Sequence, residues 1–145
     1  MNEGGGRWVL DSYAIMAWLA NEPGSDQVAR LLTTPSASLY MSAINVGEVY
    51  YLLCRRRGRD QAREVEGVLY DHPRVRIAEA GRDRVRAAGD IKALGRLSLA
   101  DAFAAALALE LDAVLLTGDS EFRLLERDRS LRVEWMGPTE LSDPE

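Results

Sequence analysis

Short apolar segments alternate with amphipathic segments along this chain of 145 residues. Trp8–Leu10, Leu39–Met41 and Ala113–Leu116 are continuous apolar runs of strand length, as expected for strands buried on both faces of a sheet. Val75–Ile77 alternates apolar and polar residues like a strand, and Arg132–Trp135 is predicted as the last strand. The pattern therefore predicts a sheet of about four to five short strands.

The segments between these strands place apolar residues at helical spacing, and residues that commonly begin or end helices flank them. Ser42 and Ser98 are suited to be N-caps, whereas Pro23-Gly24 and Gly58 mark helix ends. We expect helices between Asp11 and Pro23 and then over Ser25–Leu32, Ala43–Arg57, Gln61–Leu69, Arg82–Leu94 and Ser98–Leu111.

Strands that alternate with helices form parallel sheets whose two faces are covered by helices. The predicted fold class is therefore α/β, a three-layer α/β/α sandwich with a central, mainly parallel sheet. The chain length suits one domain, residues 1–145, and we find no internal repeat, low-complexity tract or interdomain linker. Residues 1–7, with glycines at 4–6, are expected to form a flexible N-terminal tail before the first strand.

The composition is that of an ordinary globular protein, with 47% hydrophobic and 28% charged residues. No apolar stretch approaches the roughly 20 residues of a membrane-spanning helix, and the polar N-terminus lacks the apolar region of a signal peptide. The single cysteine, Cys54, cannot form an internal disulfide, which fits a reducing compartment. We therefore expect a cytoplasmic protein that does not associate with membranes.

The net charge of −5 argues against a protein that binds nucleic acid through bulk positive charge. All basic residues except Lys92 are arginines, and several are grouped at 55–59 and 74–86. Arginine pairs well with phosphate, but such groups are more often solvated helix faces. The arginine groups support nucleic-acid binding only weakly.

Two acids follow predicted strands directly, where ligands bind in open parallel sheets. Asp11 comes after the first strand, and Asp119 follows the fourth strand after Thr117-Gly118. Either carboxylate also suits the N-cap of the next helix, which is an alternative to a role in a site.

Glu48 has Ile44 and Leu52 as its neighbours four residues before and after, so it lies on an apolar stripe of its helix. A buried unpaired charge is costly. A purely structural explanation therefore needs a buried arginine partner or exposure at the helix start. Asn45 lies one turn earlier and could hydrogen-bond or orient the Glu48 carboxylate.

Asp101 matches a loose capping box with Ser98, with Asp in place of the preferred Glu. The helix that follows, 102–109, is apolar on nearly every face and is therefore expected to be buried. An acid in the first turn of a buried helix points into the interior or a cleft. Capping and a role in a site are compatible for Asp101.

If these four carboxylates converge they need a cation, because like charges at about 4 Å repel by roughly 4 kcal/mol per pair at an effective dielectric of about 20. Oxygen ligands without histidine or cysteine favour Mg²⁺ or Mn²⁺ over zinc, and the only histidine, His72, lies in a predicted turn. A cation held by carboxylates suits phosphodiester hydrolysis, since it activates water and neutralises charge on the phosphate. No histidine or cysteine has the context of a covalent nucleophile.

Taken together, four segments resemble the PIN-domain family, in particular the bacterial toxin ribonucleases of the VapC type. They are Val9-Leu10-Asp11-Ser12, Ser42-Ala43-Ile44-Asn45-Val46-Gly47-Glu48-Val49, Ser98-Leu99-Ala100-Asp101-Ala102 and Leu115-Leu116-Thr117-Gly118-Asp119-Ser120-Glu121-Phe122. Each segment alone is weakly specific, but their order and spacing agree along nearly the whole chain. The resemblance implies a PIN-like α/β/α fold.

The resemblance implies these catalytic and metal-binding acids: Asp11, Glu48, Asp101 and Asp119. It places Ser12 and Thr117 as polar residues near the metal, and Glu121 matches a position that is sometimes acidic but equally fits a solvated loop carboxylate. The implied chemistry is Mg²⁺- or Mn²⁺-dependent endonucleolytic RNA cleavage that leaves a 5′-phosphate without a covalent intermediate. The implied partners are RNA, a second copy in a homodimer and a cognate antitoxin that occupies the active-site groove.

Three alternatives remain at this stage. The chain could be a PIN-like nuclease of RNA processing that has no antitoxin, or an RNA-binding scaffold that kept the fold and lost catalysis. A signalling module of the receiver type also places acids at strand ends and binds Mg²⁺, but it needs a lysine after a late strand. Lys92 lies instead in the helix before Ser98, which disfavours that module.

Overall fold

The strands and helices of the computed structural model, which describes residues 5–137, follow one another in the predicted order. The strands are β1 (Gly6–Leu10), β2 (Ala37–Ser42), β3 (Val75–Ala78), β4 (Val114–Thr117) and β5 (Val133–Trp135). The helices are α1 (Ser12–Leu19), α2 (Ser25–Leu32), α3 (Ala43–Arg57), α4 (Arg59–Asp71), α5 (Arg82–Lys92), α6 (Leu99–Leu111), the 3-10 helix η1 (Ser120–Phe122) and α7 (Arg123–Asp128).

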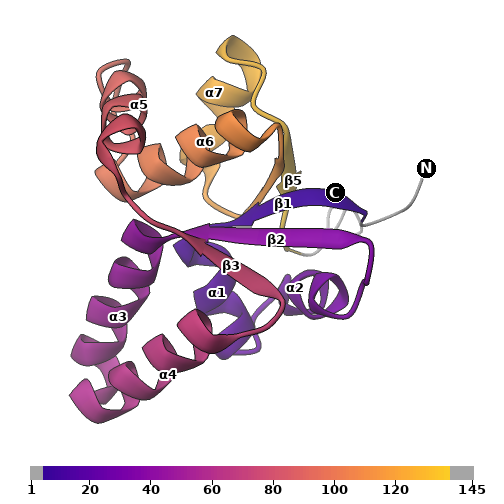
Figure 1. Ribbon diagram of the computed structural model, residues 1–145, viewed down its shortest axis with the longest axis vertical. Coiled ribbons are helices and arrows are strands. Elements are labelled where there is room, and N and C mark those ends of the chain that lie inside the picture. The colour runs from indigo at the N-terminus through magenta and orange to yellow at the C-terminus, as the bar shows by residue number, and fades with distance from the viewer. Residues whose placement is uncertain (1–4, 138–145) are drawn as a thin grey trace, which may run out of the picture.

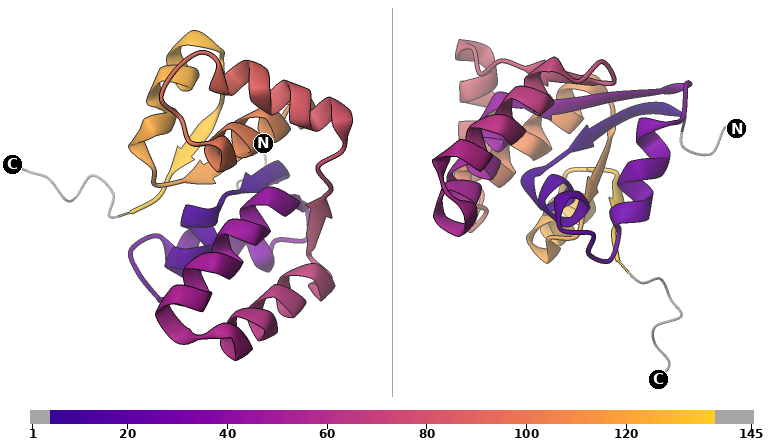
Figure 2. Two further views of the ribbon diagram at one scale, coloured as in Figure 1. Left: turned by 90° about the vertical axis from the view of Figure 1, so that its left-hand side faces the viewer. Right: turned by 90° about the horizontal axis from the view of Figure 1, so that it is seen from below.

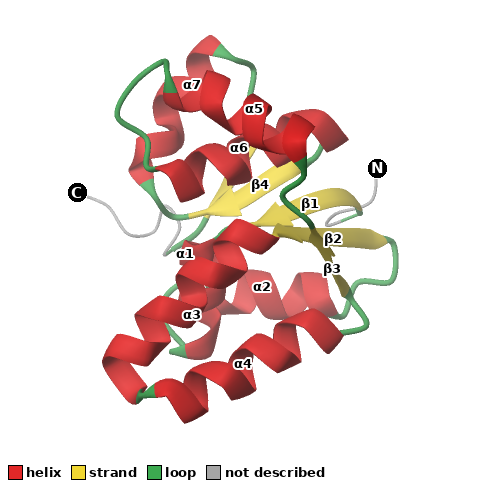
Figure 3. Cartoon of the chain, turned by 60° about the vertical axis from the view of Figure 1, so that its left-hand side comes forward, coloured by secondary structure: helices red, strands yellow, loops and turns green. Residues whose placement is uncertain are grey.

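All five strands run parallel in the order β3-β2-β1-β4-β5, with β1 at the centre (Figure 3). Helices α1 to α4 lie on one side of the sheet and α5 to α7 on the other (Figure 1). Figure 2 shows the same division from two further sides, with α3 beside α4 and α5 beside α6. The predicted three-layer α/β/α sandwich is therefore confirmed.

Successive side chains of the central strands pack into two separate hydrophobic cores, because side chains alternate between the two faces of a sheet. Leu10 and Leu116 pack toward α1 to α4, whereas Val9 and Leu115 pack toward α6 and α7. All four side chains are fully buried. This double burial explains why β1 and β4 read as continuous apolar runs.

One prediction about local structure was wrong, and one helix was not predicted. The strand β1 begins at Gly6, so Gly6 and Arg7 are not part of a tail; residues 1–4 of that predicted tail lie outside the described residues. The short helix α7 was not predicted, because its sequence is mostly charged and it is only six residues long. It forms because Phe122 and Leu125 are buried against the sheet, which is a tertiary contact.

The described helices include none that is long and apolar enough to cross a membrane.

Candidate active site

The predicted acids meet beyond the carboxyl ends of β1 and β4, two adjacent central strands. After β1 the chain builds β2 and β3 on one side, and it then returns to place β4 on the other side. Loops diverge at such a reversal of strand order, and the crevice between them is the usual ligand site in open parallel sheets. Asp11 directly follows β1, and Asp119 comes two residues after β4.

Asp11 is almost completely buried, with 1% of its surface exposed, and both of its carboxylate oxygens are hydrogen-bonded. Oδ1 accepts from the backbone N–H of Ala14 at 2.8 Å, which makes Asp11 the N-cap of α1. Oδ2 accepts from the Thr117 hydroxyl at 2.5 Å. Thr117 Oγ1 in turn accepts from the backbone N–H of Asp119 at 3.0 Å, so this buried threonine joins the two acids.

The remaining two acids enter from helices on opposite sides of the sheet. Asp101, 8% exposed, lies in the first turn of α6, where its N–H donates to the Ser98 hydroxyl at 3.1 Å. Glu48 is half-buried in α3 and lines the same groove as Asp101 and Asp119. The capping interpretation is therefore correct for Asp11 and for Asp119, which caps η1, whereas α6 is capped by Ser98 and only the Ser98 half of the predicted capping box is formed. The three aspartates nevertheless lie in one cluster with Glu48.

The electrostatics of the cluster show that its charges interact. Burial raises the pKa of Asp11 from 3.8 to about 7, against the hydrogen bonds from Thr117 and Ala14, and the charges of Asp119 and Glu48 raise it further. The pKa of Asp101 is raised to about 8, and burial is again the main cause. The charge of Asp119 and a hydrogen bond with it contribute next, and the charges of Asp11 and Glu48 contribute least. The site therefore resists carrying four negative charges unaided.

Glu121 belongs to the same cluster, a point on which the sequence left two readings open. Carboxylate oxygens of Asp101, Asp119 and Glu121 lie within 4.8 Å of one another. In the part of the chain that the structure describes, no arginine or lysine forms an ion pair with any acid of the cluster. Uncompensated carboxylates at this spacing fit a hard divalent cation such as Mg²⁺ or Mn²⁺.

Asn45 holds together the three helices that carry the buried acids, but it does so differently from our expectation. Its side chain does not hydrogen-bond Glu48. Its Nδ2 donates to the Ser12 hydroxyl at 3.1 Å and to the Ala100 carbonyl at 3.3 Å, and Ser12 Oγ donates to the Asn45 carbonyl. These contacts join the first turns of α1, α3 and α6. Asn45 is completely buried, and its Oδ1 has no hydrogen-bond partner among the described residues.

We expect Asn45→Ala to lower the free energy of unfolding by about 2–3 kcal/mol, because it leaves the Ser12 hydroxyl and the Ala100 carbonyl without their buried donor. Ser12→Ala, which keeps the contact between Asn45 and Ala100, should cost only about 1 kcal/mol. Urea unfolding of both variants measures the difference. Equal stability of Asn45→Ala and wild type would contradict this role.

The acids open into a groove whose cavity volume is about 350 Å³. Helix α1 forms one wall and α3 the other, and the lining residues that we did not predict are Tyr13, Met16, Ala17, Glu22, Leu52 and Arg56. One signal for part of this set was present in the sequence: Leu52 and Arg56 continue the stripe of Glu48 at intervals of four residues. Nothing in the sequence indicated that Tyr13 faces the same groove.

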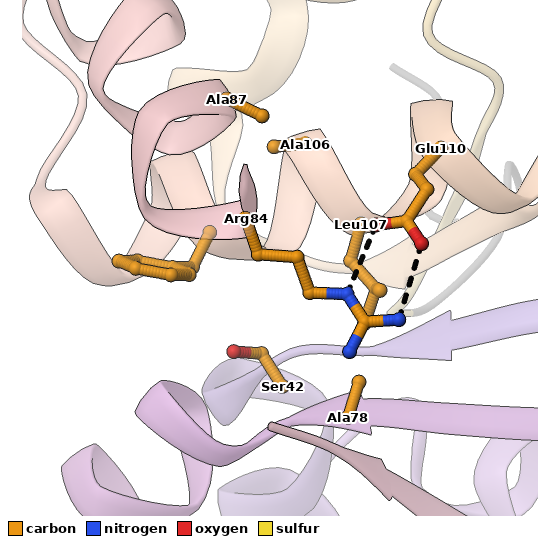
Figure 4. A pocket seen from close by; sticks show the side chains of 8 residues that line it. Ser42, Ala78, Arg84, Ala87, Ala106, Leu107 and Glu110 are labelled. Atoms are coloured by element: carbon orange, nitrogen blue, oxygen red, sulfur yellow. Dashed lines mark hydrogen bonds and ion pairs between the residues drawn. The ribbon is translucent and has the colours of Figure 1, made fainter. Parts of the chain in front are cut away.

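A second cavity lies between α5, α6 and the carboxyl ends of β2 and β3, but it is much smaller (Figure 4). Its volume is about 10 Å³, roughly enough for one water molecule. Arg84 spans it, with Nε and Nη2 donating to the two carboxylate oxygens of Glu110 at 3.0 and 3.1 Å. This cavity is therefore a packing gap with a paired charge and is too small for a substrate.

The chain matches the model of the PIN domain family over residues 8–128. Its fold is similar to VapBC2 from Rickettsia felis bound to a DNA fragment from their promoter, with a TM-score of 0.68, 15% identity and coverage of 90% of this chain and 99% of that one. VapBC-1 from nontypeable Haemophilus influenzae has a TM-score of 0.66 at 22% identity, covering 90% and 98%. Mycobacterium tuberculosis VapC20, a sarcin-ricin loop cleaving toxin, has a TM-score of 0.66 at 20% identity, covering 82% and 94%. No curated protein matches the chain significantly in sequence.

Proposed function

Because this chain belongs to the PIN domain family, we propose that it is a metal-dependent endoribonuclease and the toxin of a toxin–antitoxin pair. The observation that carries the proposal is the cluster of Asp11, Glu48, Asp101 and Asp119, in which burial and mutual repulsion raise the pKa of two acids. Such a cluster is costly unless a ligand compensates it. A divalent cation is a hard ligand that suits such carboxylates, and the oxygens of Asp101, Asp119 and Glu121 lie within 4.8 Å of one another.

The acids of the cluster would bind Mg²⁺ or Mn²⁺, and neighbouring hydroxyl side chains would orient these acids. When bound, the ion supplies Lewis acidity that activates water and neutralises charge developing on a phosphodiester. Thr117 orients Asp11 and the backbone of Asp119, and Ser98 fixes the helix turn that presents Asp101. Burial and the neighbouring charges raise the pKa of Asp101, so binding of the cation would favour loss of its proton.

The proposed partners follow from the similar structures. The VapBC assemblies from R. felis and H. influenzae support a cognate antitoxin as a partner of this chain. The cleavage of the sarcin-ricin loop named for the M. tuberculosis toxin supports our proposal of RNA as the substrate of this chain. A homodimer and a cytoplasmic location complete the proposal, and both rest on the resemblance to VapC-type toxins.

We expect purified protein to cleave RNA internally in the presence of Mg²⁺ or Mn²⁺, to leave 5′-phosphates and to lose this activity in EDTA. Mapping new 5′ ends in cellular RNA after induced expression would identify the target as transfer, ribosomal or messenger RNA. Failure to cleave any of these RNAs with either metal, or cleavage that is undiminished in EDTA, would contradict the proposed function.

A further inference from the structure

One arginine and one tyrosine line the acidic groove, and neither has a role in the cluster of acids described above. The groove is lined by Tyr13 and Met16 from α1 and by Leu52 and Arg56 from α3. Its acidic lining residues are Glu22, Glu48, Asp101 and Asp119. Arg56 is the only basic residue among the described residues that line it. A polyanionic substrate that approaches five carboxylates needs a positive contact close by, because the net charge of the chain is −5.

Arg56 is placed to supply that contact. It shares one face of α3 with Glu48 and Leu52, at intervals of four residues, and lies about 12 Å along the helix axis from Glu48. The Arg56 side chain is exposed and forms no hydrogen bond or ion pair in the part of the chain that the structure describes. Its neighbour Arg55, in contrast, lies over the Tyr51 ring at 5.1 Å.

Tyr13 is held at the opposite wall of the groove. It lies in the first turn of α1, two residues after Asp11, and 46% of its surface is exposed. Its ring occupies the space beside Gly118, where a Cβ atom would overlap it. Gly118 directly precedes Asp119, so the ring is packed against the loop that carries this acid. An exposed ring that is fixed in this way loses little conformational entropy when a base stacks on it.

We propose that Tyr13 and Arg56 are the residues that seat RNA in the groove, Arg56 by binding a backbone phosphate and Tyr13 by stacking on a base beside the phosphodiester that is cleaved. This inference rests on the proposed function and adds substrate-binding residues to it. The two contacts flank the acids from α3 and α1, so they set the strand across the cluster. Arginine pairs with phosphate through two parallel hydrogen bonds, and aromatic rings stack on bases of any sequence.

RNA binding by Arg56 variants tests the phosphate contact. Binding is measured by fluorescence anisotropy with a short, labelled single-stranded RNA of mixed sequence, in an Asp101→Asn background so that cleavage does not interfere. We expect Arg56→Ala to weaken affinity about tenfold and to reduce the slope of log affinity against log salt by about 0.7, the value for one phosphate contact on a single strand. Arg56→Lys should retain the slope. The matched control is Arg57→Ala, which removes an exposed neighbouring arginine that does not line the groove.

The Tyr13 variants test stacking in the same assay. Tyr13→Ala and Tyr13→Leu should weaken affinity about tenfold without a change in the salt slope, because stacking involves no phosphate, whereas Tyr13→Phe should bind like the parent protein. Tyr70→Ala, at an exposed tyrosine outside the groove, is the control. With Asp101 intact, an unchanged rise in melting temperature on adding Mg²⁺ would show that the Tyr13 and Arg56 variants keep the acidic cluster in place.

The outcomes separate this inference from the function on which it rests. Cleavage by the wild type, together with unchanged RNA affinity in Arg56→Ala and Tyr13→Ala, would overturn the inference and leave the ribonuclease standing. Loss of affinity in both variants with the two different salt responses would support it. If the wild type neither binds nor cleaves RNA, both the inference and the proposed function are wrong.

Discussion

Replacing Asp101 or Asp11 by asparagine is expected to lower RNA cleavage by more than about a hundredfold, because even groups that merely orient metal ligands contribute about 10–100-fold. Each substitution keeps the size of the side chain and removes one negative oxygen from the cluster. Both wild-type acids have raised pKa values because they are buried, so a neutral amide is compatible with the folded state. The loss should therefore arise in the chemistry and not in the fold.

Cleavage rates of the two variants, with circular dichroism spectra to verify the fold, measure this effect. Asp83→Asn is the matched control, since Asp83 also lies in the first turn of a helix, α5, but is exposed and does not line the acidic groove. The control should cleave RNA like the wild type. Undiminished cleavage by both Asp11→Asn and Asp101→Asn would overturn the assignment of the site.

Without divalent metal, the protein should become less stable as the pH rises from about 4 to about 8. Asp11 and Asp101 have pKa values of about 7 and about 8 in the folded state, against 3.8 as the ordinary value. The folded state therefore binds more protons than the unfolded state within this window, so the free energy of unfolding falls as the pH rises. The total loss is on the order of several kcal/mol.

Mg²⁺ should reverse part of this loss above about pH 7, because a ligand that binds only the native state stabilises it by about 2.7 kcal/mol at a hundred times its Kd. Melting temperatures in EDTA and in millimolar Mg²⁺, recorded across the pH range, measure both effects. The double variant Asp11→Asn/Asp101→Asn is the control and should show a much flatter dependence on pH. A wild-type melting temperature that changes neither with pH nor with Mg²⁺ would contradict the coupling of these acids.

Much of the fold was predictable because its signals are local. The bounds of α2 and α3 agree with the predicted residues, since Gly24, Ser42 and Gly58 are helix-terminating or capping residues whose preferences act within one turn. The buried strands were recognisable because apolar residues on both faces leave a continuous run. The start of β1 and the helix α7 were not predictable, because they depend on pairing with β2 and on packing of Leu125 against a distant sheet.

The candidate site was predictable to a similar degree. The carboxylate of Glu48 is visible in the sequence because it conflicts with the apolar stripe on which it lies. Asp11 and Asp119 are visible because they follow buried strands, where ligands bind in open parallel sheets. The role of Asn45 was not visible, since its partners are Ser12, 33 residues earlier, and Ala100, 55 residues later. Tyr13 reads as an ordinary helix residue, and only its contact with Gly118 places it beside the acids.

The sequence by itself determined most of the strands, helices and caps, and its resemblance to the PIN-domain family singled out Asp11, Glu48, Asp101 and Asp119 as a set. Periodicity and capping are properties of neighbouring residues, so one chain is enough to reveal them. Only the tertiary structure decided that Glu121 joins these acids and that Tyr13 and Arg56 face the same groove. The first relation arises where β4 is inserted beside β1, which brings residues more than a hundred positions apart into contact, as in the hydrogen bond between Thr117 and Asp11. The second arises where α1 packs against α3.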